Sequence, residues 1–514
     1  MVRQTKILMT IGPASMDKLD LLLSKVEGVR MNFSHGDHAG HLREIKAVRE
    51  ISKDLPLMLD TAGPEIRITE ALKVGKEPVS LKKLKTSVPL SVCGSDTLIV
   101  DDGKFRVHVL EDGLVCQKEG TLRRGAKVIC HGKDINLPTL TKRDIADIKF
   151  GVNEGIDMVA LSFVRTPEDV IETNTLLRDL GAEDVAVIVK IEHWKALENL
   201  REIIRLSDGV MVARGDLAVE VPYQQVPTLQ KKLVKMALEM RRPTIVATQM
   251  LHSMMTCPTP TRAELSDIAN AVLDGADAVM LSGETSLGQY PVEAVEVMNT
   301  MVQEAEKEVR MNLPPRTITE ELALSAKTIA EKMGAQLFCE TNTGRTARRI
   351  AKFRPSVPIY VKTPTPRRAR QLRLLWGVQQ GLPDKGYVVH VEHLADHPGI
   401  KVEYKGPVLA RGETYGTGMV VGVVGKGVVR LDGRNKQLPE QALGVLYYGK
   451  ENDPLLQGCI RKGIPAIIPN QQVENGVPVI VDFDFGMVIQ NDNYRYESLL
   501  NRFPQLRGPR YPSF

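Results

Sequence analysis

A short apolar run that ends in polar residues recurs eight times in the first part of the chain. Each run is too brief for a helix and has the length of a strand. Stretches with helical spacing separate most of the runs, and strand–helix alternation repeated eight times is typical of a (β/α)8 TIM barrel. We therefore predict an α/β fold with such a barrel at residues 1–67 and 149–312. The runs lie at residues 6–11, 28–34, 55–61, 157–163, 185–189, 209–213, 243–249 and 277–284.

Polar residues close these predicted strands, and in a barrel of this kind the carboxyl ends of the strands carry the chemistry. A barrel made only for stability would not need so many polar groups at one end. We therefore place a candidate active site there. The polar strand ends are Asn32, Ser34, Asp60, Thr61, Ser162, Lys190, Glu192, Asp216, Thr248, Ser282 and Glu284.

The stretch from residue 185 to 216 gives the strongest single indication of an active site. It is predicted to form a strand, a helix at 194–206 and a second strand. Side chains alternate across a strand, so Lys190 and Glu192 project to the same side. The next strand ends at Asp216. Two carboxylates from adjacent strand ends suit Mg²⁺, which usually takes one or two carboxylates and leaves its other positions to water and substrate. A pair of surface salt bridges is the alternative reading.

Residues 68–148 interrupt the alternation between the third and fourth strands with short β-like runs and Gly and Asp turns. Connections in a barrel are normally a few residues long. We predict an inserted small β-barrel domain that covers the catalytic end as a lid and excludes water.

A second, small α/β unit is predicted at residues 316–385, after a break at Pro314 and Pro315. Its first strand leads into a Thr- and Gly-rich turn that opens a helix. Such a turn is a candidate phosphate site because backbone N–H groups gather at a helix start. The candidate residues are Thr341, Thr343, Gly344, Arg345 and Thr346.

The remaining residues, 386–514, are rich in Gly and in β-like segments, and we predict a separate, mostly-β unit there. The chain of 514 residues carries a net charge of only +5, so charge gives no indication of nucleic acid or membrane as a partner. Its six cysteines are scattered without a CxxC pair, which fits a reducing compartment. No apolar run approaches ~20 residues, so we expect a cytoplasmic protein.

The strand ends lie within a series of motifs, among them TKILMTIGPAS (5–15), RMNFSHG (30–36), DTAGPEIR (60–67), SDGVMVARGDLAVE (207–220), ATQMLHSM (247–254) and the long run at 260–291. Together these motifs resemble the pyruvate kinase family, strongly over residues 1 to about 310 and more weakly to about 380. Beyond that point the family's usual C-terminal end is not found. The resemblance implies a phosphotransferase of glycolysis that moves a phosphoryl group from phosphoenolpyruvate to ADP and then protonates the enolpyruvate.

The resemblance also implies roles for individual residues. Glu192 and Asp216 would hold Mg²⁺ or Mn²⁺, and Lys190 would neutralise charge on the migrating phosphoryl group. Arg30 would grip the phosphate, and Thr248 would lie where the enolate is protonated, most simply through a water. The residues implied in substrate binding are Arg30, Ser162, Lys190, Gly215, Asp216 and Thr248.

Two further sites follow from the resemblance. Asn32, Ser34, Asp60 and Thr61 would hold K⁺, and Glu65 is the residue typical of family members that require this ion. The nucleotide would meet Asn32, His35 and Arg67. A zinc site at His35, His38 and His41 is not favoured, because residues three apart on a helix drift around it and only neighbours share a face.

The resemblance further implies a homotetramer and a phosphorylated allosteric effector, with no nucleic acid or membrane partner. Residues 400–514 faintly resemble the swivelling phosphohistidine domain of phosphoenolpyruvate-utilising enzymes, but no histidine follows His397. We therefore expect this part to act structurally or in regulation. A phosphoenolpyruvate/pyruvate-class barrel lyase or aldolase, and a non-catalytic scaffold, are the alternatives. A lyase would need neither the inserted lid nor nucleotide-binding residues such as Arg67, so their presence disfavours it. A non-catalytic scaffold would be expected to have lost Lys190, which is present.

Overall fold

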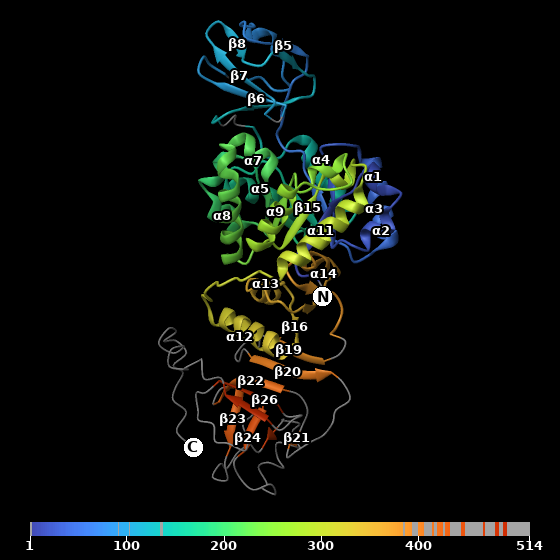
Figure 1. The fold of residues 1–514 in the computed structure, drawn as a ribbon, viewed down its shortest axis with the longest axis vertical. Helices are drawn as coiled ribbons and strands as arrows, with labels where there is room; N and C mark the ends of the chain where they lie inside the picture. The colour runs from blue at the N-terminus through green and yellow to red at the C-terminus, as the bar shows by residue number, and fades with distance from the viewer. Residues whose placement is uncertain are drawn as a thin grey trace. The chain divides into compact units, whose positions relative to one another are not determined.

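The computed structural model describes residues 3–90, 92–101, 103–133, 137–383, 386–392 and 399–405, together with seven strands between residues 414 and 490. The chain divides into two compact units, and Figure 1 labels many of the helices and strands of each. The first contains Met1–Met311 and Thr365–Trp376, and the second contains Asn312–Pro364 and Gly377–Phe514. None of the described helices is both long and apolar enough to cross a membrane.

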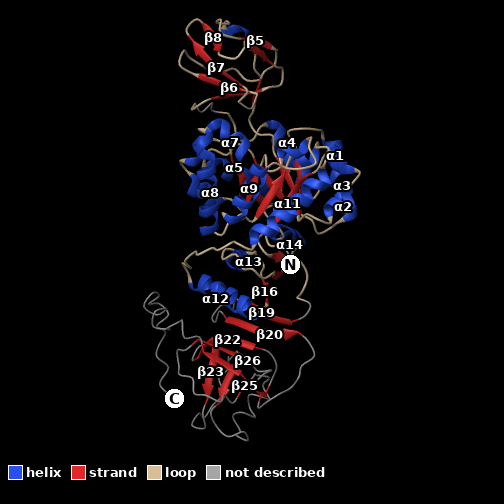
Figure 2. Ribbon diagram, viewed as in Figure 1, coloured by secondary structure: helices blue, strands red, loops and turns tan. Residues whose placement is uncertain are grey.

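Eight parallel strands form a closed barrel in the first unit, and each predicted run supplies one of them. The strands are β1 Lys6–Thr10, β2 Gly28–Asn32, β3 Leu57–Asp60, β11 Met158–Leu161, β12 Ala186–Ile191, β13 Gly209–Ala213, β14 Thr244–Ala247 and β15 Ala278–Leu281. Around the barrel they follow the order β1-β15-β14-β13-β12-β11-β3-β2, and β1 pairs with β15 to close it. Figure 2 shows helices around these strands, so the predicted barrel is confirmed.

The helices of this unit follow the strands that they connect. They are α1 Pro13–Met16, α2 Leu19–Leu23, α3 His38–Ile51, α4 Lys142–Asn153, α5 Pro167–Asp179, α6 Leu200–Leu206, α7 Arg214–Glu220, α8 Val226–Glu239, α9 Arg262–Leu273, α10 Gly283–Ser286, α11 Pro291–Glu306 and α14 Pro366–Leu372. A reciprocal capping box, between Thr261 and Glu264, starts α9. The single helix predicted at 194–206 is broken, because Asn199 leaves helical geometry between a 3-10 turn, η2 (Trp194–Leu197), and α6.

Apolar side chains from alternate positions of the barrel strands fill its interior. They include Leu8, Met58, Met158, Ile188, Met211, Ile245 and Met280. Burying a side chain of this size contributes roughly 1.5–3 kcal/mol relative to exposure. Leu374, which follows α14, belongs to the same core.

Residues 365–376 were predicted within the α/β unit at 316–385 but belong to the barrel unit. Besides Leu374, Gln371 donates to the carbonyls of Asp157 and Asp184 at 2.8 and 2.7 Å. The backbone N–H of Trp376 donates to the Asp277 carboxylate at 3.0 Å. The three acceptors lie just before barrel strands, so this segment covers the end of the barrel opposite the strand carboxyl ends.

The insertion between β3 and β11 is a β domain with its own core, as the sequence predicted. Its strands are β4 Ile66–Arg67, β5 Leu72–Val74, β6 Thr97–Val100, β7 Phe105–Leu110, β8 Gly113–Cys116, β9 Gly120–Leu122 and β10 Lys127–Cys130. Five pair in the antiparallel order β4-β10-β6-β7-β8, and β5 pairs with β9. Leu98, Val107 and Leu114 lie at the centre of its core. We call this insertion the lid.

The second unit contains a mixed sheet flanked by helices α12 (Ile318–Met333) and α13 (Arg345–Ala351). The sheet strands are β16 Gln336–Glu340, β17 Ile359–Lys362, β18 Val378–Gln379, β19 Gly386–Glu392 and β20 Gly399–Lys405, in the order β18-β17-β16-β19-β20. Strand β19 pairs parallel with β16, and β20 pairs antiparallel with β19. The boundary predicted between residues 385 and 386 is therefore wrong, because it divides a continuous sheet.

Seven further strands follow, consistent with the mostly-β composition predicted for this part of the chain. They are β21 Thr414–Tyr415, β22 Met419–Val424, β23 Gly427–Leu431, β24 Gly444–Tyr447, β25 Ala466–Ile467, β26 Pro478–Asp482 and β27 Met487–Gln490. Strand β22 pairs antiparallel with β20, so the sheet continues into this region. The segment 455–462, where a phosphohistidine would be expected, lies outside the described residues.

Candidate active site

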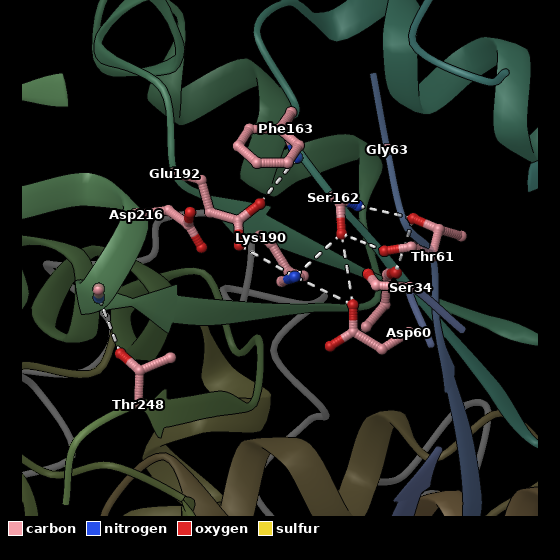
Figure 3. A network of polar contacts seen from close by, with 12 residues as sticks. Ser34, Asp60, Thr61, Gly63, Ser162, Phe163, Lys190, Glu192, Asp216 and Thr248 are labelled. Atoms are coloured by element: carbon pink, nitrogen blue, oxygen red, sulfur yellow. Dashed lines mark hydrogen bonds and ion pairs between the residues drawn. The ribbon is translucent and has the colours of Figure 1, made fainter. Parts of the chain in front are cut away.

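Lys190, at the end of β12, is the centre of a polar network at the carboxyl ends of the barrel strands (Figure 3). Its Nζ lies 2.9 Å from Asp60 Oδ1, 2.9 Å from Ser162 Oγ and 2.9 Å from Glu192 Oε1. The structure therefore brings together residues from three strand ends, β3, β11 and β12, around one ammonium group.

The surroundings of Lys190 keep it charged. Burial opposes the charged form, but the Asp60 and Glu192 carboxylates raise the pKa of Lys190 above its usual value. Burial would likewise raise the pKa of Asp60, but Arg30 and Lys190 lower it below its usual value. The site therefore holds a fixed positive charge that needs no proton uptake to act on an anionic substrate.

Arg30 adds a second cation from β2. Its Nε donates to Asp60 Oδ2 at 2.7 Å, and its Nη1 donates to Thr10 Oγ1 at 3.2 Å. Ser162 is held by the neighbouring strand, because its hydroxyl lies 2.6 Å from the Thr61 carbonyl. Asp60 thus orients two cations at once.

Glu192 and Asp216 supply the carboxylate pair. Glu192 Oε2 accepts the backbone N–H of Phe163 at 2.9 Å. Its Oε1 is buried and receives no hydrogen bond from any described residue, although the Lys190 ammonium lies close to it. Burial, only partly offset by Lys190, raises the pKa of Glu192 to about 7, and the neighbouring Asp216 charge acts in the same direction. Figure 3 shows Asp216 next to Glu192.

This pair fits a divalent cation. A buried carboxylate oxygen that accepts no hydrogen bond is stabilised by neighbouring positive charge, from Lys190 and from a metal ion, and hard oxygen ligands suit Mg²⁺ and Mn²⁺. Within the described part of the chain, no group of three or more His, Cys, Asp or Glu side chains could hold a metal ion. A cation here would thus take two protein carboxylates and leave its other positions to water and substrate.

Thr248 and Gly215 form a separate contact across β13 and β14, because Thr248 Oγ1 accepts the Gly215 N–H at 2.8 Å. Thr248 has φ of 69°, and Gln249 has φ of 54°. These are left-handed conformations that non-glycine residues rarely adopt, and such strain is typical of functional sites.

The three histidines after β2 do not share one site. His38 Nε2 lies 2.6 Å from Asp147 Oδ1, whereas His41 Nδ1 lies 2.8 Å from Glu44 Oε2. His35 is exposed, and its carbonyl contacts His41. These separate partners agree with the sequence argument against a zinc site.

The predicted potassium residues lie at the adjacent ends of β2 and β3, where Asn32 pairs with Asp60. Asn32 Oδ1 accepts the backbone N–H of Ser34 at 3.2 Å. Thr61 Oγ1 accepts the N–H of Ser162 at 3.0 Å. The oxygens predicted to bind potassium therefore lie close together, but Asn32 Oδ1 and Thr61 Oγ1 already accept backbone hydrogen bonds.

Some predicted residues are held away from the Lys190 network. Arg67 lies in the lid, where its guanidinium pairs with Glu65 and donates to the Gly125 carbonyl at 2.8 Å. Glu284 is structural, since it accepts the backbone N–H groups of Leu251 and Ser282.

The predicted effector turn opens α13. Thr341 Oγ1 accepts the N–H of Gly344 at 3.0 Å, and Gly344 takes a left-handed φ of 79° that suits glycine. Thr343 and Arg345 are exposed, whereas Thr341 and Thr346 are buried. Only part of the predicted set is therefore available to a ligand.

Sequence reasoning missed one residue of the site. Lys127, on lid strand β10, donates through Nζ to Asp216 Oδ1 and lies 3.6 Å from Glu65 Oε1. No motif marks Lys127, because its role depends on how the lid meets the barrel. Only the contact of Lys127 with Asp216 in the folded structure indicates that this lysine belongs to the site.

A (β/α)8 barrel with an inserted lid, and with a lysine and two carboxylates at its strand ends, is typical of barrel enzymes that act on anionic substrates. Comparison with known families narrows this class. The family model described as "Pyruvate kinase, barrel domain" matches residues 2–92 and 84–295, and "Pyruvate kinase, alpha/beta domain" matches residues 320–415. The chain belongs to the pyruvate kinase family and is a phosphotransferase.

Individual relatives support the same family assignment. A pyruvate kinase of Bacillus licheniformis is 40% identical over 419 residues, which cover 73% of this chain and 71% of the relative. One from Clostridium acetobutylicum is 37% identical, over 75% of this chain and 89% of the relative. One from Staphylococcus epidermidis is 34% identical, and its match reaches 95% of this chain and 99% of the relative. The C-terminal region is therefore shared with at least this relative.

Proposed function

We propose that the chain transfers the phosphoryl group of phosphoenolpyruvate to ADP, giving pyruvate and ATP, with Mg²⁺ or Mn²⁺ and K⁺ as cofactors. The observation that carries this proposal is the buried Lys190 ammonium, fixed by Asp60, Ser162 and Glu192. A fixed positive charge beside a carboxylate pair suits a reaction in which negative charge moves between phosphoryl and enolate oxygens.

In the first step, a terminal phosphate oxygen of ADP attacks phosphorus, and the bond from phosphorus to the enol oxygen breaks. Lys190 and Arg30 provide positive charge beside the transferred group, and Asp60 holds both cations in place. Glu192 and Asp216 would hold the divalent cation, which supplies further charge stabilisation for the enolate and phosphoryl oxygens when bound.

In the second step, the enolate takes up one proton at carbon and becomes pyruvate. Thr248 is the proposed residue for this step, and its hydroxyl, which accepts the Gly215 N–H at the strand ends, supports this role. An unperturbed hydroxyl is a weak acid at neutral pH, so a water held by Thr248 delivers the proton. The Gly215 backbone and Ser162 complete the substrate pocket in this proposal.

Asn32, Ser34, Asp60 and Thr61 are the proposed ligands of K⁺, because their oxygens gather at two adjacent strand ends. Asn32, His35 and Arg67 are the proposed nucleotide contacts, and Arg67 would have to leave its present partners in the lid, Glu65 and Gly125, to reach the nucleotide. A cytoplasmic location, a homotetramer and a phosphorylated effector at the α13 turn belong to the same proposal. The free Cys93, Cys116 and Cys130 support a reducing compartment.

A lactate dehydrogenase-coupled assay tests this function. Pyruvate should form from phosphoenolpyruvate only when ADP, a divalent cation and K⁺ are all present. Pyruvate formation that does not depend on ADP would contradict the phosphotransferase and favour the lyase alternative.

A further inference from the structure

The peptide group between Phe33 and Ser34, in the loop after β2, is held on both sides. Its carbonyl oxygen accepts a hydrogen bond from Arg143 Nη2 at 2.7 Å, and its N–H donates to Asn32 Oδ1 at 3.2 Å. Arg143 belongs to α4 and lies 110 positions further along the chain than Phe33. An arginine of a distant helix therefore fixes the orientation of a peptide between two proposed K⁺ ligands, Asn32 and Ser34.

The Arg143 side chain is oriented by its own helix. It is 53% exposed, but its Nε lies 3.6 Å from Oδ2 of Asp147, which is one turn further along α4 and almost fully buried. Side chains four residues apart on a helix are neighbours, so this pair restricts the guanidinium. Asp147 Oδ1 also lies 2.6 Å from Nε2 of His38, the first residue of α3. Asp147 thus links the arginine to the helix that follows the loop.

Other parts of the loop are fixed without Arg143. The Phe33 ring is 1% exposed and stacks on the His41 ring, with 3.9 Å between the ring centres and 19° between the planes. His41 Nε2 lies 2.9 Å from the His35 carbonyl oxygen. The ring packing and this contact hold the loop against α3. Arg143 adds the orientation of the peptide between Phe33 and Ser34.

The orientation of this peptide matters to a cation bound by Asn32 and Ser34. An amide oxygen has two lone pairs, so Asn32 Oδ1 can accept the Ser34 N–H and also face a cation. If the peptide turned, Asn32 Oδ1 would lose this donor, and the Asn32 and Ser34 oxygens would no longer keep one relative position. A charged donor on a carbonyl oxygen forms a stronger hydrogen bond than a neutral one and polarises the rest of the chain of hydrogen bonds.

We propose that Arg143 is a positioning residue for the activating monovalent cation: by holding the Phe33 carbonyl, it fixes the relative position of Asn32 and Ser34. This inference rests on the proposed K⁺ site. Arg143 acts through these two residues and does not touch the reacting atoms. Its loss should therefore raise the K⁺ concentration that the enzyme requires, and a high K⁺ concentration should restore most of the turnover.

The test compares wild type with Arg143→Ala, without substrates. The midpoint of thermal unfolding is measured in rising KCl, with tetramethylammonium chloride keeping the ionic strength constant. A cation that binds only the folded protein raises this midpoint according to its affinity. The curve of Arg143→Ala should be displaced about tenfold to higher K⁺, near the lower end of what a hydrogen bond to a charged group contributes.

Two further variants complete the comparison. Arg143→Lys keeps a charged donor, so its curve should lie between those of wild type and Arg143→Ala. Lys149→Ala is the matched control, because Lys149 is exposed on the same helix and has no hydrogen bond or ion pair with any residue that the structure describes. Its curve should coincide with that of wild type. The K⁺ concentration for half-activation of pyruvate formation should follow the same order.

Ser34→Ala, which removes a proposed ligand, separates the positioning role from the K⁺ site itself. If Ser34→Ala displaces the curve but Arg143→Ala follows wild type, the K⁺ site stands and the positioning role is wrong. If Arg143→Ala lowers the midpoint in tetramethylammonium alone and leaves the K⁺ dependence unchanged, Arg143 is merely structural and the proposal is overturned. If K⁺ and tetramethylammonium stabilise wild type equally, the proposed K⁺ site fails and the role of Arg143 fails with it.

Discussion

Lys190 and Asp60 come from strands β12 and β3, more than a hundred residues apart in the chain, and their charged atoms lie 2.9 Å apart at the same end of the barrel. Asp60 also receives Arg30 Nε at 2.7 Å. Because all three side chains are nearly inaccessible to solvent, removing the shared carboxylate would leave two buried cations without a counter-charge. Asp60 is therefore the residue on which the position of both cations depends.

Potassium should activate the enzyme strongly. The oxygens of Asn32, Ser34, Asp60 and Thr61 gather at the ends of β2 and β3, and together they would offer the ion several oxygen ligands. Turnover measured in KCl should exceed turnover in tetramethylammonium chloride at equal ionic strength. Ser34→Ala should raise the K⁺ concentration needed for half-activation. Equal rates in the two salts would show that the cluster holds no activating ion.

The turn before α13 should bind the phosphate of a regulatory metabolite. Thr343 and Arg345 are exposed there, beside the left-handed Gly344 that starts the helix. Sugar phosphates and nucleotides should shift the phosphoenolpyruvate saturation curve of wild type, and Thr343→Ala should reduce that shift without changing the rate at saturating substrate. Identical curves for both proteins with every metabolite would rule out this turn as the effector site.

The position of a C-terminal truncation should decide its effect. A chain that ends after Lys405 keeps β19 and β20 on the sheet. A chain that ends near Pro383 lacks β19, which pairs with one edge of β16. The longer form should retain basal turnover with altered cooperativity, effector response or oligomer size, as measured by kinetics and light scattering.

The shorter truncation is the matched comparison. It should expose the edge of β16 and unfold at a lower temperature. Loss of all turnover in a folded chain ending at Lys405 would show that the barrel depends on the final region.

Lys6 should make stability depend on pH. It is fully buried in β1, and burial lowers its pKa from 10.5 to about 8, with Glu27 opposing the shift. Between these two values the unfolded chain binds more protons than the folded one, so the free energy of unfolding should rise with pH from about 8 to 10.5. Denaturant titrations at several pH values should show this rise, and Lys6→Met should lose it relative to wild type.

Local sequence pattern sufficed to predict much of the barrel and the gathering of polar residues at its strand ends. Each strand is a short apolar run, and alternation alone puts Lys190 and Glu192 on the same side of β12. Asp216 could be anticipated beside them because neighbouring parallel strands end at the same edge. The family resemblance supplied the activity, and the family comparisons agree with it.

Other features depend on tertiary contacts that a local pattern does not contain. Gly386–Glu392 looks like the start of a Gly-rich region, yet this strand joins the earlier sheet because it pairs with β16. The α14 segment has ordinary helical spacing, and its assignment to the first unit comes from tertiary contacts, such as the burial of Leu374 in the barrel core and the Gln371 hydrogen bonds. Lys127 reaches Asp216 across a domain boundary, which no spacing along the chain encodes.

The most direct test of the central claim, that Lys190 acts on the migrating phosphoryl group beside a metal held by Glu192, compares two variants. Lys190→Met should lower kcat for pyruvate formation by about 10²-fold or more and leave Mn²⁺ binding no weaker than in wild type. Glu192→Gln should weaken Mn²⁺ binding. A folded Lys190→Met enzyme with near-wild-type turnover would contradict this mechanism.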